Sequence, residues 1–459
     1  MTTAATTRAT TTVPTVRYHA EQAWLGDERP AKRVLIEVAG DTITAVTPGV
    51  DAPADAVRLR GLTLPGLANT HSHVFHRAIR GHSQSGVADF WAWRDLMYGV
   101  AERLDPDDLY ELARATYAEM ALSGVTAVGE FLYLHHQPGG APYADPNELG
   151  HAVVAAARDA GLRITLLDTC YLQADVAGGP LRGVQRRFDD GHWKAWAERL
   201  DALADDDHLK VGAAIHSVRA VPREAMAGIA DYAHSRDLPL HVHLSEQPAE
   251  NAACEEHFGM TPTALLHAEG VLGARTTAVH ATHLTADDIG LLGSTMTTVS
   301  MCCTTERDLG DGVGPAVELH AAGSPLVVGS DAHMVIDLWE EARAVELDER
   351  LVRGVRGHLS APTLARALTA NGAASLGWDA GRIEVGALAD LVTVRLDTPR
   401  TAGARSGDAL AHAVFAATAA DVDTVVVGGD VVVAGGVHRT VGDVGTVLER
   451  AIDAVLPEQ

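Results

Sequence analysis

The chain has 459 residues, of which 47% are hydrophobic and 44 are glycine, so it can bury a large core and exceeds the length of one average domain. Its formal net charge is −25, from 61 acidic and 36 basic side chains. This charge argues against nucleic acid or an anionic membrane as a partner, because both attract basic surfaces. A small-molecule enzyme or a protein-binding module remains.

The N-terminal segment and the cysteines bear on where the protein works. Residues 1–13 lie in the run "MTTAATTRATTTVPTV", which has no apolar core of signal-peptide length, and we expect them to form a disordered tail. No apolar run of about 18 residues follows. The four cysteines include one adjacent pair but no CxxC pattern. We therefore expect reduced thiols and a cytoplasmic protein.

Both ends of the chain read as short strands joined by tight turns. In the run "KRVLIEVAGDTITAVTPG", apolar and polar residues alternate between Gly-Asp and Pro-Gly turns. A similar alternation occurs in "GALADLVTVRLD". In "VDTVVVGGDVVVAGGV" the Gly-Gly-Asp step predicts a hairpin. We expect residues 14–62 and 386–445 to form one small β-sandwich domain, with a C-terminal helix over residues 446–459.

Between these regions, apolar β-branched runs alternate with stretches of helical period such as "PDDLYELARATYAEMALSG", which is typical of a parallel sheet. Eight such runs predict an α/β fold, a TIM-like (β/α)8 barrel over residues 63–385. A doubly wound open sheet competes, but it would place a Gly-rich phosphate loop after its first strand, and none follows there. The runs are "LTLPGLANTH", "VTAVGEF", "RITLLDTC", "VGAAIHS", "LPLHVHL", "TTAVHATH", "MTTVSMCC" and "SPLVVGSD".

Polar or titratable residues end nearly every run, and the carboxyl ends of barrel strands form the face that carries the chemistry. At the first end, His71 and His73 are two residues apart, so both rings lie on one side of an extended chain and can converge on one ion. Two histidines with this spacing can also occur by chance in a chain with 23 histidines. The strand-end residues are His71, His73, Glu130, His216, His243, His280, Thr304 and Asp331.

Two of the later strand ends complete a ligand set for a metal. A catalytic zinc takes nitrogen and oxygen ligands and keeps one position open for water. The residues that provide such a set are His71, His73, His243 and Asp331. Alone, His243 would be read as a packed core histidine and Asp331, in "GSDAH", as a turn or helix-capping residue. Separate explanations for all four residues account for the pattern less well than one metal site.

The motifs around these residues, "PGLANTHSH", "HVHLSEQ", "VHATH" and "GSDAH", resemble those of the amidohydrolase superfamily, metal-dependent hydrolases with a distorted barrel and a flanking β-sandwich. The resemblance covers nearly the whole chain from residue 16. The ligands of its mononuclear deaminase branch fall on His71, His73, His243 and Asp331, and its proton shuttle on Glu246. The two-metal branch usually carries a lysine where this chain offers His216, so we expect one zinc per subunit, with Fe²⁺ or another divalent metal as the alternative.

The resemblance implies a division of labour in hydrolysis. Bound zinc lowers the pKa of its water toward 7, and Asp331 could accept the proton of that water while ligating the metal. Glu246 could protonate an imine nitrogen and then pass a proton to departing ammonia. His280 would polarise the water. Without the "HLSEQ" motif, Glu246 would be read as a surface residue of a loop.

A more detailed resemblance is to the formimidoylglutamate deiminase family of histidine degradation, which converts N-formimidoyl-L-glutamate and water to N-formyl-L-glutamate and ammonia. This resemblance rests on long segments that follow strands. Such segments lie in loops, which determine substrate specificity more than fold. These segments are "FWAWRDLMY", "GVTAVGEFLYLHH", "YADPNEL", "IHSVRAV", "LHVHLSEQ" and "TTERDLGDGVGP".

A substrate with two carboxylates needs local positive charge in a protein this acidic. Arg219 is the main candidate to bind a carboxylate, and the resemblance places substrate contacts on Arg219, His216 and Tyr133. Arg94, in a loop after the first strand, is the candidate for the second carboxylate. The alternative for Arg94 is a surface residue stacked on Trp91 or Trp93.

Two positions depart from some family members. His76 stands where they carry Gln and can still hydrogen-bond a substrate carboxylate, whereas Leu132 stands where they carry His and cannot. The open alternatives are another deaminase of this branch, acting on guanine, cytosine-like or S-adenosylhomocysteine-type substrates, and an inactive barrel that serves in metal binding or assembly. The resemblance favours a homodimer, with "FWAWRDLMY" as a candidate contact.

Overall fold

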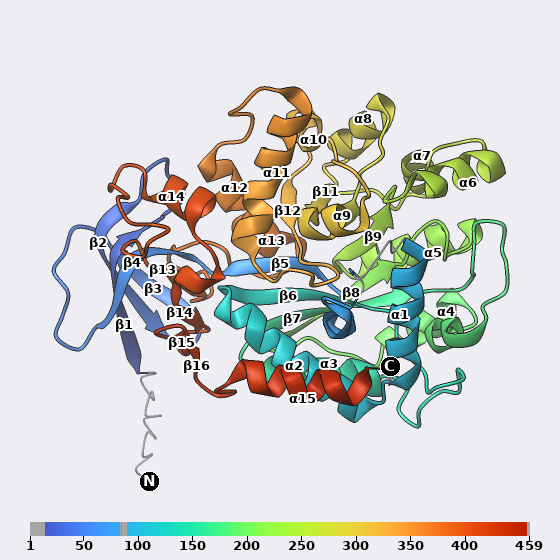
Figure 1. Ribbon diagram of the computed structural model, residues 1–459, viewed down its shortest axis with the longest axis horizontal. Helices are drawn as coiled ribbons and strands as arrows, with labels where there is room; N and C mark the ends of the chain where they lie inside the picture. The colour runs from blue at the N-terminus through green and yellow to red at the C-terminus, as the bar shows by residue number, and fades with distance from the viewer. Residues whose placement is uncertain (1–13, 83, 85–89, 457–459) are drawn as a thin grey trace, which may run out of the picture.

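The computed structural model describes residues 14–82, 84 and 90–456, with the side chains of residues 90–92 excepted. The predicted tail over residues 1–13 and the last three residues of the predicted C-terminal helix lie outside this range. Figure 1 shows the strands of both chain ends gathered on one side of the molecule, and a larger body of strands and helices beside them.

The strands of the two chain ends form one mixed sheet, which in the described chain has the order β16-β15-β14-β13-β4-β1-β2-β3. β1 runs parallel to β4 and antiparallel to β2, and β13 of the C-terminal region pairs antiparallel with β4 of the N-terminal region. The predicted hairpin is confirmed as β14 and β15. The strands are β1 (Thr15–Ala23), β2 (Ala31–Ala39), β3 (Thr42–Thr47), β4 (Val57–Pro65), β13 (Leu391–Val394), β14 (Val422–Val427), β15 (Asp430–Ala434) and β16 (Val437–His438).

The other eight strands of the described chain form a parallel sheet in sequence order, β5 to β12, which curls into a nearly closed barrel. The predicted (β/α)8 architecture is therefore confirmed, and the open doubly wound sheet is not what this chain forms. The strands are β5 (Leu67–Ser72), β6 (Val125–Leu132), β7 (Arg163–Cys170), β8 (Leu209–Ile215), β9 (Leu240–Leu244), β10 (Thr276–His280), β11 (Thr298–Met301) and β12 (Leu326–Val328).

The barrel closes between its first strand and the segment after its last. The Asp331 N–H donates to the carbonyl of His71 at 3.0 Å, and the His73 N–H donates to that of Asp331 at 3.2 Å. Gly329 makes this approach possible, because a Cβ built there would lie 2.8 Å from the backbone nitrogen of His71. The closure thus brings the two ends of the predicted ligand set together.

Helices cover the outside of the barrel, and in Figure 1 α15 lies along α2. The α-helices are α1 (Phe90–Arg103), α2 (Pro106–Leu122), α3 (Glu148–Asp159), α4 (Trp193–Leu200), α5 (Arg223–Ser235), α6 (Pro248–Phe258), α7 (Pro262–Ala268), α8 (Ala286–Ser294), α9 (Cys303–Leu309), α10 (Ala316–Ala322), α11 (Leu338–Arg353), α12 (Ala361–Leu368), α13 (Ala370–Ser375), α14 (Ala409–Ala416) and α15 (Val444–Val455). Short 3-10 helices are η1 (Val74–Ile79), η2 (Gly183–Phe188) and η3 (Ala419–Asp421).

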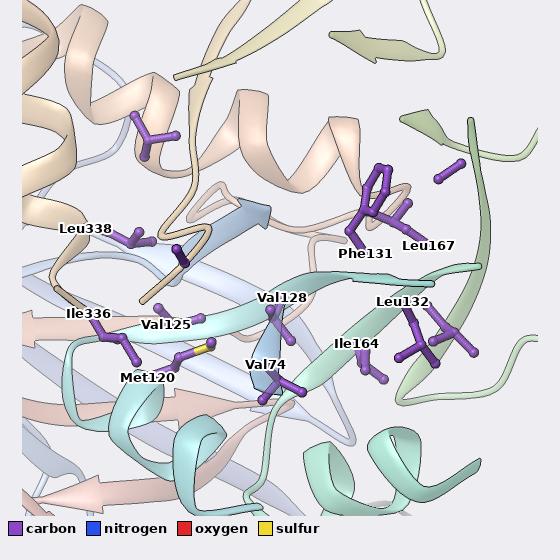
Figure 2. Packing of buried hydrophobic residues seen from close by; sticks show 14 of the residues in the cluster. Val74, Met120, Val125, Val128, Phe131, Leu132, Ile164, Leu167, Ile336 and Leu338 are labelled. Carbon is purple, nitrogen blue, oxygen red and sulfur yellow. The ribbon is translucent and has the colours of Figure 1, made fainter. Parts of the chain in front are cut away.

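Continuous burial of the barrel strands explains their near-continuous apolar sequences. Every residue of β6 and of β7 is buried, as expected where a parallel sheet is covered on both faces. Figure 2 shows Val128 and Phe131 of β6 packed close to Ile164 and Leu167 of β7. The core therefore fixes both strands along their whole length.

Two elements differ from the sequence prediction. The run "LTLPGLANTH" is not one strand: β4 ends at Pro65 in the terminal sheet and β5 begins at Leu67 in the barrel. The "FWAWRDLMY" segment lies in helix α1 rather than in a loop, because it packs against η1 and η2 and tertiary burial favours the helical state. Among the described residues, no helix combines the length and apolarity needed to cross a membrane.

Candidate active site

The four residues predicted to bind a metal come together at the carboxyl end of the barrel. Nε2 of His243 lies 3.1 Å from Nε2 of His71 and 3.3 Å from that of His73. Oδ1 of Asp331 lies 3.3 Å from Nε2 of His71 and 3.5 Å from that of His73. All four side chains are buried. His280 forms a second group with His71 and Asp331 in which ligand atoms could share an ion.

Backbone carbonyls fix how two of these rings carry their protons. Nδ1 of His73 donates to the carbonyl of Phe131 at 2.9 Å, and Nδ1 of His243 donates to that of His216 at 2.8 Å. Burial lowers the pKa of both rings, so each is neutral and turns an unprotonated Nε2 toward the other. Converging lone pairs beside a carboxylate are what a divalent cation binds. The donor set fits such an ion.

Glu130, to which the sequence gives no role, holds the segment that carries both strand-one histidines. It accepts hydrogen bonds from Ser72 Oγ at 2.5 Å and from the Val74 N–H at 2.7 Å, the neighbours of His73 on either side. Tyr117 donates to it from α2 at 3.1 Å. Its side chain is fully buried, and burial raises its pKa to about 8. The only sequence signal was its place near the end of a buried strand.

Asp331 reaches the cluster because the chain turns sharply after β12. Its φ is 45° and that of His333 is 58°, both in the left-handed region that non-glycine residues rarely adopt. His333 lies behind the ligands, with Nδ1 2.9 Å from Ser330 Oγ and Nε2 3.1 Å from Ser72 Oγ. Hydrogen bonding around the turn therefore supports a strained backbone at a functional position.

His280 lies among three carboxylates. Its Nδ1 is 3.4 Å from Oε1 of Glu306, and its Nε2 is 3.8 Å from Oε1 of Glu246 and 3.9 Å from Oδ2 of Asp331. Burial opposes charge on the ring, but the surrounding carboxylates raise its pKa to about 10. His280 can therefore act as a charged hydrogen-bond donor beside the metal cluster. Glu306 was not predicted, since no spacing in the sequence connects it with His280.

Arg219 and Glu246 face the same cavity from different loops. Nη2 of Arg219 lies 3.8 Å from Oε2 of Glu246, and its Nε donates to Oε2 of Glu250 at 2.8 Å. Glu250 is buried and also accepts the Ser245 N–H at 2.9 Å. Burial by itself would lower the pKa of Arg219, but the two nearby glutamates have the larger effect and raise it. Glu250, like Glu306, was not predicted from the sequence.

Three predicted substrate contacts form one wall next to the metal cluster. Nε2 of His76 hydrogen-bonds to the Tyr133 hydroxyl at 2.9 Å. The Tyr133 ring packs edge-on against His216, with ring centroids 5.4 Å apart, and His76 packs against His73 at 4.8 Å. Nδ1 of His76 is buried and has no hydrogen-bond partner among the described residues.

Arg94, predicted in a loop, lies instead in helix α1 and lines the cavity. Its guanidinium lies 5.5 Å from the centroid of the Tyr98 ring. The stacking on Trp91 that the sequence left open involves a side chain outside the described part of the structure. The helix brings Arg94 to the same cavity as Arg219.

One cavity joins these groups and has a positively charged part. Burial raises the pKa values of Tyr98 and Tyr171, and both Arg94 and Arg219 oppose the rise, so the two hydroxyls lie in the field of both guanidiniums. Gln185 of η2 lies beside them, with Nε2 3.4 Å from the Tyr171 hydroxyl. The sequence analysis did not include these three neutral donors, which come from three separate segments.

Other residues singled out by the sequence lie away from this cavity. Thr304 is in α9, where its hydroxyl donates to buried Glu341. Leu132 is buried in β6. Cys302 and Cys303 are buried free thiols, as expected of small core residues. None of these four lines the cavity within the described part of the chain.

Comparison with known proteins connects this site to a family. The model of the Amidohydrolase family matches residues 62–432. The formimidoylglutamate deiminase of Pseudomonas aeruginosa is 37% identical over 91% of this chain and 95% of its own length. A 5-methylthioadenosine/S-adenosylhomocysteine deaminase of Natronomonas pharaonis is 30% identical over 85% of each chain. The crystal structure of an amidohydrolase from Brucella melitensis superposes with a TM-score of 0.87 at 30% identity, over 96% of this chain and all of the other.

Proposed function

Because this chain belongs to the amidohydrolase family, we propose that it hydrolyses N-formimidoyl-L-glutamate to N-formyl-L-glutamate and ammonia, as a step in histidine degradation. The chain is a hydrolytic enzyme that acts on carbon–nitrogen bonds. The relative from Pseudomonas aeruginosa supports the specific substrate. The structural observation that carries the proposal is a cavity that connects a metal-binding cluster with two guanidiniums.

The two guanidiniums match the charge of the substrate. N-formimidoyl-L-glutamate carries two carboxylates, and Arg94 and Arg219 line the same cavity as the metal ligands. A guanidinium binds a carboxylate through two parallel hydrogen bonds. We assign one carboxylate to each arginine, with His216 and the His76–Tyr133 pair as further hydrogen-bonding groups.

The metal-binding residues define where the reacting carbon lies. We propose zinc as the metal, with Fe²⁺ or another divalent ion as the alternative. Bound there, such an ion supplies Lewis acidity and lowers the pKa of water toward neutrality. The ion would be held by His71, His73, His243 and Asp331, which offer three nitrogens and one oxygen.

The remaining residues of the site move and hold protons. Asp331 can take the proton of the attacking water. Glu246 lies 3.8 Å from His280 and from Arg219. Its protonated carboxyl group can give a proton to the imino nitrogen, take one from the hydroxyl added to the carbon and pass that proton to the amino group, which leaves as ammonia. The water proton held by Asp331 then restores the carboxyl group of Glu246. His280, whose Nε2 lies 3.9 Å from Oδ2 of Asp331, can orient the attacking oxygen. Burial of these groups strengthens each electrostatic interaction.

A second candidate function is deamination of a nucleoside or nucleobase. Aromatic side chains of the cavity, which include Trp93, Tyr133 and Phe188, could stack on a ring, and the 30% identical relative is named for such a substrate. The charge of the cavity favours the dicarboxylate, because Arg94 and Arg219 both line it and a neutral base offers no carboxylate to either guanidinium.

The deciding experiment compares ammonia release by the zinc-loaded protein from N-formimidoyl-L-glutamate, S-adenosylhomocysteine and guanine. We expect turnover of the first compound alone. Turnover confined to the nucleoside or the base would overturn the proposal in favour of the second candidate. The homodimer and the cytoplasmic setting stay predictions from the sequence.

A further inference from the structure

We infer that Arg187 is a positioning residue, which docks helix α1 onto the cavity and thereby sets the place of Arg94 and Tyr98. Arg187 lies in η2 and is fully buried. Its side chain does not line the cavity. The inference rests on the proposed function only for the role of the helix in binding substrate.

The contacts of Arg187 join two walls of the cavity. Its Nη2 donates to the carbonyl of Leu104 at 2.7 Å, its Nη1 donates to that of Ala101, and its Nε donates to that of His136 at 2.8 Å. Ala101 lies in the last turn of α1, and Leu104 directly follows the helix. These are the carbonyls that a helix leaves without internal partners at its C-terminus.

The position of this charge is unusual for a structural arginine. In the described chain no carboxylate lies within ion-pair distance of Arg187, so the carbonyls and the negative end of the α1 dipole are its compensation. Burial lowers its pKa, yet a guanidinium stays charged in proteins. This buried charge is held by the end of α1 and by the carbonyl of His136, and Tyr143, Glu102 and Asp105 also favour it. It therefore ties α1 to η2.

Both elements that Arg187 joins line the cavity. Helix α1 contributes Arg94 and Tyr98, and η2 contributes Gln185. The carbonyl of Arg187 itself accepts the N–H groups of His135 and His136, which fixes η2 to the segment after β6. Arg187 therefore determines how far the guanidinium of Arg94 lies from the barrel.

The chain contains a matched control for this arrangement. Arg343 of α11 is also buried and also binds three backbone carbonyls, those of Trp339, Phe415 and Ala417. Unlike Arg187, it also forms an ion pair, with Glu340 at 3.3 Å. Phe415 and Ala417 lie at the C-terminal end of α14. None of these residues lines the cavity, so a Lys substitution at Arg343 reports the structural cost alone.

The test compares R187K with R343K in the zinc-loaded protein, by steady-state kinetics on N-formimidoyl-L-glutamate and by amide hydrogen exchange. Since a small misplacement of a binding group is costly, we expect R187K to raise KM at least about fivefold with little change in kcat. We also expect faster exchange in residues 93–104 and unchanged metal content. R343K should lower Tm without changing KM or exchange in α1.

Equal KM values for R187K and the unsubstituted protein, or equal KM changes in both variants, would overturn the inference. If R187K does not fold, native-state exchange of the unsubstituted protein in mild denaturant decides: α1 and η2 should open as one unit, and separate opening would overturn the inference. Absence of ammonia release by the unsubstituted protein would contradict the proposed function alone, because the exchange results still test the role of Arg187.

Discussion

Glu250 holds Arg219 from its buried side, with Oε2 of the glutamate 2.8 Å from Nε of the arginine. Nη2 of the same guanidinium lies 3.8 Å from Oε2 of Glu246. Because Glu250 is buried and binds Arg219 directly, it determines where this positive charge stands in the cavity. In the proposed arrangement the ion pair is therefore part of the substrate site, although Glu250 touches no substrate.

Replacing Glu250 by Gln should weaken substrate binding and stability together. The amide keeps the shape but removes the charge. Glu250 is fully buried whereas 34% of the Arg219 side chain is exposed, so the loss of stability should lie between the about 0–1 kcal/mol of exposed pairs and the about 3–5 kcal/mol of buried ones. We expect KM for N-formimidoyl-L-glutamate to rise by about tenfold, or about 1.4 kcal/mol, with metal content unchanged. Kinetics and denaturant unfolding measure both effects.

The matched control is E269Q, which breaks the partly exposed pair of Arg223 with Glu269, 2.6 Å apart. Exposed pairs contribute about 0–1 kcal/mol, so this variant should keep the KM of the unsubstituted protein. Equal KM values in E250Q and E269Q would contradict the role given to Glu250.

Glu130 should govern metal affinity without binding metal. E130A removes the acceptor of the Ser72 hydroxyl and the Val74 N–H, and loss of a residue that orients metal ligands typically costs about 10–100-fold in affinity. E130Q keeps an acceptor for Val74 and should lose less. Competition with a chromophoric chelator measures the affinities, and an E130A protein that binds zinc as tightly as the unsubstituted protein would disprove this role.

Removal of the metal should abolish turnover and lower Tm. The unprotonated Nε2 atoms of His73 and His243, 3.3 Å apart, lose the ion between them, and binding to the folded state alone stabilises it by about 4 kcal/mol at a 1,000-fold excess over Kd. Dialysis against a chelator, followed by calorimetry and re-addition of zinc, measures both. Full activity in protein shown to be free of metal would refute the proposed chemistry.

E246Q should bind zinc normally and lose catalysis. Glu246 is not among the grouped ligand atoms of the described residues, and removal of a general acid and base costs about 10²–10⁴-fold in rate. We expect this loss in kcat with metal content equal to that of the unsubstituted protein. A fully active E246Q variant would contradict the role assigned to Glu246.

Asp421 gives a pH-dependent contribution to stability away from the site. Burial opposes its ionisation, but Arg400, with Nε 2.7 Å from Oδ2, and the hydroxyl of Thr398, 2.6 Å from Oδ1, lower its pKa to about 2. A lowered carboxyl pKa stabilises the fold above the unfolded value of about 4, and the contribution is lost as the pH falls through about 2.

The corresponding variant is D421N. Above pH 5, the free energy of unfolding of D421N should lie about 2 kcal/mol below that of the unsubstituted protein. This difference should shrink below pH 4. Denaturant unfolding of both proteins between pH 3 and pH 7 tests this. A deficit that grows as the pH falls would show that the sign assigned to Asp421 is wrong.

Most of the barrel could be predicted from the sequence because its strands are buried on both faces. All eight apolar runs contain barrel strands, and "RITLLDTC" matches β7 in full. The division of the first run at Gly66 and the helical state of "FWAWRDLMY" were not predicted. Both depend on which distant segments lie alongside, since Leu64 pairs with Val392 of β13 and α1 packs on η1 and η2.

The sequence by itself determined which residues converge on one candidate metal site, because a period of two in a strand and the common edge of parallel strands place His71, His73, His243 and Asp331 together. Only the tertiary structure decided which groups hold them. Glu130 binds a residue 58 positions away and Arg187 one 83 positions away. Buried polar groups must find partners wherever the fold provides them, and no local pattern records that choice.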